Sequence, residues 1–463
     1  MMRKPKINIV TLGCSKNKVD SERLAAILND NYDIVHDSDK KSDIVIINTC
    51  GFIGDAKEES IDTILEYAEL RKTNKVKKLY VMGCLSQRYR KELQEEIHEV
   101  DGFFGVESVQ LIANDILNEE LGIKRQKSKD ESLKISESQS PLFSDSQILR
   151  FSDSYNHERL LSTPSHYAYL KISEGCNRRC AFCAIPLIRG EHVSVPMNDL
   201  LKEARLLADK GVKELILIAQ DLTYYGRDID GQYHIVELVK RLLEIKEFEW
   251  IRLHYGYPQG FPDELFDMMN NEPRICNYID LPLQHISTPI LKNMRRGVDK
   301  EQTINFVKNA RNRVPGIAFR TTFIVGFPGE TEEQFEELCD FVREMKFERA
   351  GVFAYSPEEG TPAYEMEDNV PQEIKQERVD AIMEIQQNIS LEINEKRVGT
   401  VEKVLIDRIE GDYYIGRTQY DSPEVDDEIL ISIDDNELNV GDFVNVRLIK
   451  ADYFDLYGEV FDN

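Results

Sequence analysis

The sequence predicts an α/β protein with three folded parts: an N-terminal open parallel sheet, a partial barrel of six strand–helix units, and a small C-terminal antiparallel β-barrel. Strand and helix patterns alternate over the first ~120 residues and again, on a larger scale, from about 162 to 395, whereas the last 66 residues show short strands between turn clusters. Helices between strands are typical of parallel sheets, and tight turns are typical of antiparallel ones. The expected parts are residues 1–122, a linker over 123–160, residues 161–396 and residues 397–463.

Composition narrows the class of protein. The chain has 463 residues, of which 41% are hydrophobic and 31% charged, and this is enough apolar material for more than one core. The 84 acidic residues outnumber the 58 Lys and Arg, and a net charge of −26 argues against a protein whose main task is to grip nucleic-acid phosphates. No run of about 18 apolar residues marks a membrane span, and the N-terminus lacks the long apolar stretch of a signal peptide. We therefore expect a cytoplasmic protein.

Three buried strands and two helices are expected in the N-terminal part. Short apolar runs rich in β-branched residues predict strands at Ile7–Leu12, Asp43–Thr49 and Lys78–Gly83. Apolar residues at helical spacing predict helices at Asp20–Asn29 and Asp55–Leu70. The expected apolar stripe of the second helix consists of Ile61, Ile64, Leu65 and Ala68. Right-handed crossovers then make all strands parallel in one open sheet.

The linker and the central part follow. Residues 123–160 are rich in serine and in mixed charge without a regular period, which indicates a flexible connection.

The expected strands of the central part are Tyr167–Ile172, Glu214–Ile218, Trp250–His254, Tyr278–Leu283, Ala318–Val325 and Gly351–Tyr355. Helical patterns such as Asp199–Lys210 and Glu332–Met345 separate most of them, and a long polar helix over Pro371–Lys396 leaves this part. Six units predict a parallel barrel smaller than the eight-fold barrel of ~250 residues.

The last part is expected to be a small antiparallel barrel. Strands such as Phe443–Ile449 alternate with turn clusters of Gly, Asp and Asn. From residue 398 onward there are 17 acidic residues and five basic ones, so one-seventh of the chain carries nearly half of the net charge. Asp426, Asp427 and Glu428 are consecutive in an expected polar turn, where charge reversal should disturb the core least.

Cys176, Cys180 and Cys183 form a C-x3-C-x2-C motif after the first expected strand of the central part. Functional sites of barrel folds lie on the loops that follow the strands. Three thiolates in one short loop can bind three irons of a four-iron cluster, which leaves the fourth iron open to a small molecule. The alternative is a zinc site completed by His166 or His192, although structural zinc sites favour paired C-x2-C knuckles and only one is present.

Cys14, Cys50 and Cys84 each come one or two residues after an expected strand of the N-terminal sheet, and each adjoins a glycine. Parallel strands end at one edge of a sheet, so the three thiols are expected to converge there, with room for a bulky cofactor beside the glycines. The alternative is three buried structural cysteines. Cys276 and Cys339 share none of this context and are expected to pack in the core.

The C-x3-C-x2-C motif, with Phe182 before its last cysteine, resembles the signature of radical S-adenosylmethionine enzymes. With three cysteines in a preceding α/β domain and a small C-terminal barrel, nearly the whole chain outside the linker resembles the methylthiotransferase family. The blocks that carry the resemblance include GCSKNKVDSERL, GCLSQRY, SEGCNRRCAFCAIPLIRG, YIDLPLQHIS, FIVGFPGETEEQF and YDSPEVD. The resemblance implies that the C-terminal barrel is TRAM-like.

The resemblance also implies the cofactors, namely two 4Fe–4S clusters and S-adenosylmethionine. The cluster on the C-x3-C-x2-C cysteines would bind S-adenosylmethionine at its open iron, and one electron from a low-potential donor would then give a radical that removes hydrogen from an unactivated carbon. The cluster on Cys14, Cys50 and Cys84 would hold a sulfur that a second S-adenosylmethionine methylates before its delivery to the substrate.

Four residues are candidate contacts for S-adenosylmethionine: Phe182, Gln220, Asp221 and Gly326. The glycine-rich segment around Gly326 resembles the family's adenine-side segment, and a tight turn is the alternative. Gln220 and Asp221 end a strand and could hold the cofactor's amino group, and strand-end capping is their alternative. His285 is assigned no role, because most buried histidines are simply hydrogen-bonded.

Within the family, the blocks GVFAYSPEEGT, EVDGFFG and KNKVDSE resemble the branch that methylthiolates the β-carbon of an aspartate in small-subunit ribosomal protein number twelve. A sister branch modifies an adenosine in transfer RNA. The acidic C-terminal barrel favours the basic protein substrate over transfer RNA, because its charge would repel a phosphate backbone. The remaining alternatives are the transfer RNA enzyme and a non-enzymatic iron–sulfur binding module. No membrane partner is expected.

Overall fold

The computed structural model describes residues 4–38, 41–106, 109–120, 158–434 and 437–461. These residues form two compact units. The first unit comprises residues up to Ser162 together with Glu174–Cys176 and Ile185–Asp199, and the second comprises Thr163–Ser173, Asn177–Ala184 and Leu200 onward. Nearly all of the expected linker at 123–160 lies outside the described residues. No helix among the described residues is both long and apolar enough to cross a membrane.

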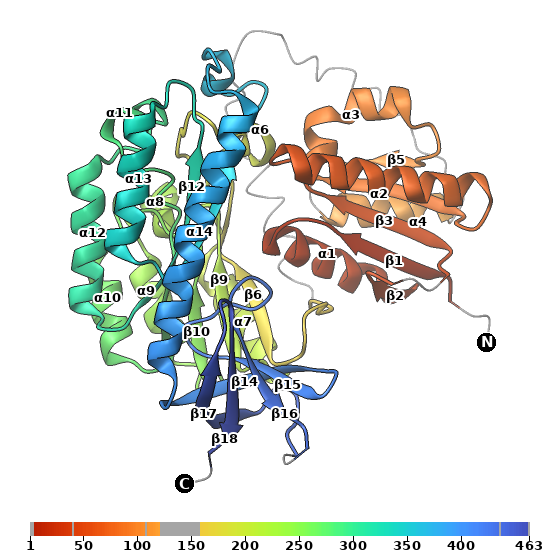
Figure 1. Ribbon diagram of the computed structural model, residues 1–463. Helices are drawn as coiled ribbons and strands as arrows, with labels where there is room; N and C mark the ends of the chain where they lie inside the picture. Colours follow the sequence, from red (N-terminus) through yellow and green to blue (C-terminus); the bar gives the residue numbers. More distant parts are fainter. Residues whose placement is uncertain (1–3, 39–40, 107–108, 121–157, 435–436, 462–463) are drawn as a thin grey trace. The chain divides into compact units, whose positions relative to one another are not determined.

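The first unit is built on a five-stranded sheet in the order β2-β1-β3-β4-β5, with every pair parallel (Figure 1). Its strands are β1 Lys6–Thr11, β2 Asp33–His36, β3 Ile44–Thr49, β4 Lys78–Gly83 and β5 Gly102–Phe103. Its helices are α1 Ser15–Leu28, α2 Gly54–Lys72, α3 Cys84–Glu96 and α4 Val109–Glu120. The expected open parallel sheet is confirmed. Two short edge strands, β2 and β5, were not predicted, because neither is long enough to show a period.

Helices cover both faces of this sheet (Figure 1). Successive side chains of a strand point to opposite faces. Ile7 and Ile9 of β1 therefore pack in one core cluster with α1 and α4, whereas Val45 and Ile47 of β3 pack in another with α2 and α3. This arrangement leaves the carboxyl edge of the sheet to the loops that follow the strands.

Only two of the four residues expected on the apolar stripe of α2 are buried. Ile64 is fully buried, but Ile61 and Leu65 are 38% and 46% exposed. The helix instead turns Ser60 inward. The Ser60 hydroxyl accepts a hydrogen bond from the N–H of Cys50 at 3.0 Å and donates one to its carbonyl at 2.9 Å. These bonds tie α2 to the end of β3 and set the rotation of the helix.

The second unit contains an open sheet of six parallel strands in the order β13-β12-β11-β10-β9-β6 (Figure 1). Its strands are β6 Tyr167–Lys171, β9 Glu214–Ile218, β10 Trp250–Leu253, β11 Ile275–Asp280, β12 Ala318–Val325 and β13 Arg349–Ala354. Neighbours in space follow chain order, so each connection crosses to the next strand, as the partial barrel requires. The fold class is thus confirmed for this part. β11 begins at Ile275, three residues earlier than expected.

Helices separate these strands. They are α7 Met197–Asp209, α8 Arg227–Asp230, α9 Ile235–Leu242, α10 Asp263–Asn271, α11 Thr288–Asn293, α12 Lys300–Arg313, α13 Glu332–Met345 and the long α14 Gln372–Arg397, with short 3-10 turns at Leu222–Tyr224 and Pro362–Glu365. Between β6 and α7 lie β7 Ser173–Glu174, α6 Ile185–Arg189 and β8 Val193–Ser194. The helix α13 begins at a capping box. The Thr331 side chain accepts a hydrogen bond from the Gln334 N–H, and the Gln334 side chain accepts one from the Thr331 N–H.

The chain ends in a closed five-stranded barrel. Its strands are β14 Val401–Glu410, β15 Tyr413–Arg417, β16 Glu428–Ser432, β17 Phe443–Ala451 and β18 Asp455–Val460. The expected small barrel is confirmed, with one difference: β16 and β18 pair in parallel, whereas the other four pairs are antiparallel. The parallel pair arises because β18 reverses direction after β17 and closes the barrel beside β16.

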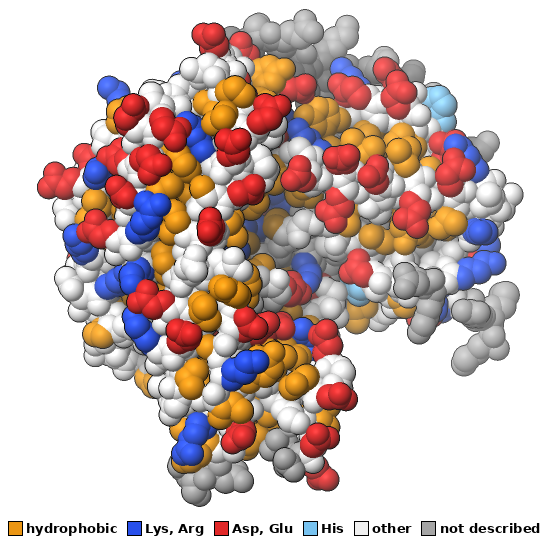
Figure 2. All heavy atoms as spheres, in the orientation of Figure 1, with side chains coloured by type: hydrophobic (Ala, Val, Ile, Leu, Met, Phe, Trp, Pro, Cys, Tyr) orange, Lys and Arg blue, Asp and Glu red, His pale blue; other side chains and the backbone are white. Residues whose placement is uncertain are grey.

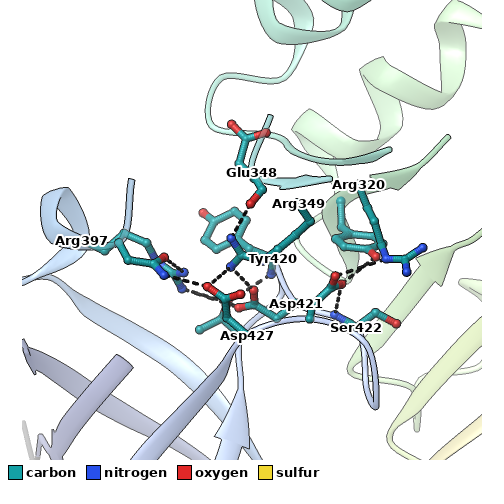
Figure 3. A network of polar contacts seen from close by, with 12 residues as sticks. Arg320, Glu348, Arg349, Arg397, Tyr420, Asp421, Ser422 and Asp427 are labelled. Carbon is teal, nitrogen blue, oxygen red and sulfur yellow. Dashed lines mark hydrogen bonds and ion pairs between the residues drawn. The ribbon is translucent and has the colours of Figure 1, made fainter. Parts of the chain in front are cut away.

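The loop between β15 and β16 corrects the expectation of an exposed polar turn. The side chains of Asp426 and Asp427 are buried, and Figure 3 shows this loop among basic side chains. Asp427 lies 3.1 Å from Arg349, and Asp426 lies 3.3 Å from Arg320 and accepts a hydrogen bond of 2.8 Å from the Tyr278 hydroxyl. Reversing these charges would therefore bury unpaired cations inside the protein.

This loop covers the amino ends of the six-stranded sheet. Arg349, the first residue of β13, donates a hydrogen bond of 2.5 Å to Asp421, and Tyr167, the first residue of β6, donates one of 3.2 Å to Glu424. The first residue of β9, Glu214, is ion-paired with Arg417 of β15. In barrel folds, residues at the amino ends of the strands stabilise the protein, and the active site lies at the carboxyl ends.

Candidate active site

The first unit gathers three cysteines at the carboxyl edge of its sheet. Cys14 is the N-cap residue of α1, Cys50 follows β3 directly, and Cys84 begins α3 directly after β4. Gly13 has a φ of +85°, and a Cβ there would lie 2.9 Å from Sγ of Cys50. Only glycine allows the Gly13 loop to approach that thiol so closely.

Charge and burial act differently on the three thiols. Burial raises the pKa of Cys50 to about 11, and thiolate charge on Cys14 or Cys84 raises it further. Burial also raises the pKa of Cys84. At Cys14 burial opposes ionisation too, but Lys16 and Arg189 outweigh it and hold the pKa below its usual value. A metal centre that binds all three as thiolates therefore needs positive charge nearby.

Asn17 connects the three cysteine loops. Its buried amide donates hydrogen bonds to the carbonyls of Leu12 at 2.9 Å and Thr49 at 3.1 Å, close before Cys14 and Cys50. Its Oδ1 atom lies 3.9 Å from Sγ of Cys84 and accepts a hydrogen bond from Arg189. Sequence patterns did not identify Asn17 or Arg189 as site residues, although both stand in the blocks that carry the family resemblance.

The three cysteines are the residues at this edge of the sheet that could hold an iron–sulfur cluster. Among the described residues, no group of three or more His, Cys, Asp or Glu side chains is placed to hold one metal ion. In an iron–sulfur cluster each cysteine thiolate binds a different iron. The edge position, the close glycine and the nearby cation all fit a cysteine-bound cluster.

The C-x3-C-x2-C motif crosses the division between the units. Cys176 belongs to the first unit, where its N–H donates to the carbonyl of Gly190 at 3.1 Å. Cys180 and Cys183 belong to the second, and the Cys183 N–H donates to the Cys180 carbonyl at 3.2 Å. Arg296 donates a hydrogen bond of 3.3 Å to Sγ of Cys180.

His166 and His192, the two histidines considered as zinc ligands, each contact another polar side chain. Nε2 of His166 lies 2.7 Å from Oδ1 of Asp407 in the C-terminal barrel. Nε2 of His192 lies 3.1 Å from the Ser194 hydroxyl. Both contacts give these histidines structural roles within their own units.

The four candidate cofactor contacts have different surroundings. Phe182 packs on the apolar cluster that contains Phe327, and Gln220 lies just beyond the end of β9. Asp221 is buried and accepts hydrogen bonds from the Thr223 N–H at 3.0 Å and from Arg178 at 2.7 Å, so it caps the 3-10 turn that follows. These bonds are the strand-end capping considered as its alternative.

Gly326 lies in a tight turn. Its φ is +69°, and a Cβ there would lie 2.2 Å from the side chain of Lys375 in α14. Glu330 closes the same turn, because its carboxylate accepts a hydrogen bond of 3.0 Å from the Phe327 N–H. The turn alone accounts for a glycine here.

Three further residues behave as core residues. Cys276 and Cys339 are 1% and 2% exposed, as expected for packing, and Cys276 belongs to an apolar cluster beside Trp250. His285 is fully buried, and its Nδ1 accepts a hydrogen bond of 2.9 Å from the Ser287 N–H.

Comparison with known proteins places these features in a family. Residues 170–342 match the Radical SAM superfamily, residues 6–105 match Uncharacterized protein family UPF0004, and residues 398–461 match the TRAM domain. The chain is 50% identical over 464 residues to the ribosomal protein uS12 methylthiotransferase RimO of Cytophaga hutchinsonii, covering 99% of this chain and 98% of that protein. The chain belongs to the RimO family. A RimO of Bacteroides thetaiotaomicron is also 50% identical, over 467 residues, covering 100% and 99% of the two chains.

Solved structures support the fold alone. The radical S-adenosylmethionine methyltransferase TsrM of Kitasatospora setae aligns with a TM-score of 0.52 at 15% identity, over 89% of this chain and 81% of TsrM. As a RimO family member with a radical SAM domain, the chain is a transferase whose family uses S-adenosylmethionine and a 4Fe–4S cluster.

Proposed function

We propose that this chain is a radical S-adenosylmethionine methylthiotransferase that modifies the β-carbon of an aspartate in ribosomal protein uS12. The observation that carries the proposal is identity of about 50%, over essentially the whole chain, to proteins named for that activity on uS12. The proposed substrate implies a cytoplasmic site of action. We propose the domain limits 1–122, 161–396 and 397–463, with a linker at 123–160.

Two 4Fe–4S clusters are part of the proposal. Cys176, Cys180 and Cys183 would bind the one that takes S-adenosylmethionine, and Cys14, Cys50 and Cys84 would bind the other. When bound, these groups and a low-potential electron donor supply the radical that removes hydrogen from an unactivated carbon and the sulfur that replaces it. No side-chain base can remove that hydrogen at a useful rate, so the chain's own part is binding and orientation.

The residues of the two sites have defined tasks in this proposal. Arg296 holds the sulfur of Cys180 in place with a hydrogen bond of 3.3 Å from its charged guanidinium. Asn17 connects the loops of Cys14, Cys50 and Cys84 through its side-chain amide. Phe182, Gln220, Asp221 and Gly326 stay candidate contacts for S-adenosylmethionine, with Asp221 acting through the orientation of Arg178.

The test uses the full chain, reconstituted anaerobically with iron and sulfide. It is incubated with S-adenosylmethionine, dithionite and either purified uS12, small ribosomal subunits or transfer RNA. Mass spectrometry of uS12 peptides should find a methylthio group on one aspartate. The Cys176→Ala/Cys180→Ala/Cys183→Ala variant should give no product. A methylthio group on transfer RNA, with none on uS12 in either form, would contradict the proposal.

A further inference from the structure

A buried guanidinium lies among the polar contacts of the Cys14, Cys50 and Cys84 site. Arg189, the last residue of α6, has a side chain only 2% exposed. Its Nη2 donates a hydrogen bond of 2.5 Å to Oδ1 of Asn17, the same atom that lies near Sγ of Cys84. A buried guanidinium needs partners, and here one partner is the amide that organises the cysteine loops.

Two carboxylates fix the other side of this guanidinium. Nη1 of Arg189 lies 2.8 Å from Oε1 of Glu174 and 3.4 Å from Oδ2 of Asp20. All of these residues belong to the first unit. The planar fork of arginine can bond Asn17 and Glu174 at once, which fixes its orientation beside the thiols. Arg189 is also a charge that favours ionisation of Cys14, Cys50 and Cys84 alike.

We propose that Arg189 is a positioning residue whose guanidinium sets the charge balance, and thereby the reduction potential, of an iron–sulfur cluster held by Cys14, Cys50 and Cys84. This inference rests on the proposed function for the presence of that cluster. Net charge and hydrogen bonds near the sulfurs are among the determinants of a cluster's potential. A nearby positive charge makes addition of an electron easier, and a nearby carboxylate makes it harder.

The experiment isolates this cluster in the Cys176→Ala/Cys180→Ala/Cys183→Ala background. Each protein is reconstituted anaerobically, its iron and sulfide are counted, and its potential is measured by redox titration followed by electron paramagnetic resonance. Arg189→Gln removes the charge and should shift the potential to a more negative value. Arg189→Lys keeps the charge and should restore most of the potential, while it loses iron faster because it lacks the fork.

Asp20→Asn should shift the reduction potential in the direction opposite to Arg189→Gln. Its side chain is 17% exposed, so the substitution is tolerable, and removing its charge should shift the potential to a more positive value. If Arg189→Gln does not fold, Asp20→Asn serves as the test instead. An unchanged reduction potential in the Asp20→Asn protein then overturns the inference. An unchanged potential in a fully loaded Arg189→Gln protein overturns it as well, as does absence of iron from the background protein.

These measurements use no uS12. A protein that shows the two opposite shifts but never modifies uS12 would therefore contradict the proposed function while supporting the role of Arg189.

Discussion

The guanidinium of Arg296 lies 3.3 Å from Sγ of Cys180, and both side chains are buried. Arg296 also stacks on the ring of Tyr257 at 4.2 Å, and Arg178 stacks on the same ring at 3.9 Å. Its second terminal nitrogen donates to the carbonyl of Pro282. The thiol of Cys180 is thus held by a cation that is itself fixed by an aromatic ring and a backbone carbonyl.

Removing this cation should weaken the cluster site on the C-x3-C-x2-C motif. In a Cys14→Ala/Cys50→Ala/Cys84→Ala background, Arg296→Gln should lose iron to a chelator about ten- to a hundredfold faster, since a hydrogen bond to a charged group contributes about 1.5–3 kcal/mol. The neighbouring Arg295 is exposed, so Arg295→Gln is the matched control. Equal rates of iron loss for the two variants would show that Arg296 does not hold the cluster.

The two cysteine sets should divide the reaction between them. The Cys14→Ala/Cys50→Ala/Cys84→Ala protein should keep about half of the iron and sulfide and still cleave S-adenosylmethionine reductively to 5′-deoxyadenosine, because three thiolates suffice for one cluster. It should form no methylthio product. Chromatography of the nucleoside and mass spectrometry of uS12 check both parts. Loss of cleavage in a protein that retains its remaining cluster would contradict this division.

Asp427 should make the stability of the protein depend on pH near neutrality. Burial raises the pKa of Asp427 to about 7, despite Arg349 nearby, whereas an unfolded aspartate titrates near 3.9. The folded state therefore binds more protons between these values, and wild-type stability falls as pH rises from about 4 to 7. Asp427→Asn does not titrate, so its free energy of unfolding relative to wild type should rise across this range, by on the order of 1–4 kcal/mol.

Denaturant unfolding of wild type and Asp427→Asn at pH 5, 6, 7 and 8 checks this. Asp412 is exposed, and Asp412→Asn serves as the control. A difference between wild type and Asp427→Asn that stays constant with pH would mean that the carboxyl is ionised throughout.

Exposed carboxylates of the C-terminal barrel should steer the basic substrate. Asp412, Asp434 and Glu437 are exposed, and the Ile433 N–H donates to the carbonyl of Asp412 at 3.1 Å, so the turns that carry them are adjacent. Figure 2 shows acidic side chains gathered near this end of the chain. Changing the three to lysine should weaken binding to uS12 on the order of tenfold at low salt and much less at high salt.

The matched control places the same change in charge on α2. Glu58, Asp62 and Glu66 are exposed there, and their conversion to lysine should affect binding less. Equal losses in the two triple variants would indicate that net charge, rather than this surface of the barrel, governs association.

Sequence patterns predicted the three inner strands of the N-terminal sheet, the six strands of the central sheet and five of the helices, because a buried strand or an amphipathic helix carries its own period. Glu214–Ile218, Ala318–Val325 and Glu332–Met345 have the expected bounds. The strands β2 and β5 were missed because four and two residues are too few for a period. The rotation of α2 was misjudged because a hydrogen bond from Ser60 to Cys50, rather than apolar spacing, decides which face it buries.

The sequence by itself determined the family, the parallel sheets and the cysteine sets, since each depends on residues close together or on a repeated strand-end context. Only the tertiary structure decided what surrounds them. Arg189 reaches Asn17 across 172 residues of sequence, and Asp427 is buried against Arg349 although its local sequence is that of a polar turn. No local pattern contains these pairings, because burial and electrostatic contact depend on which distant segments the fold brings together.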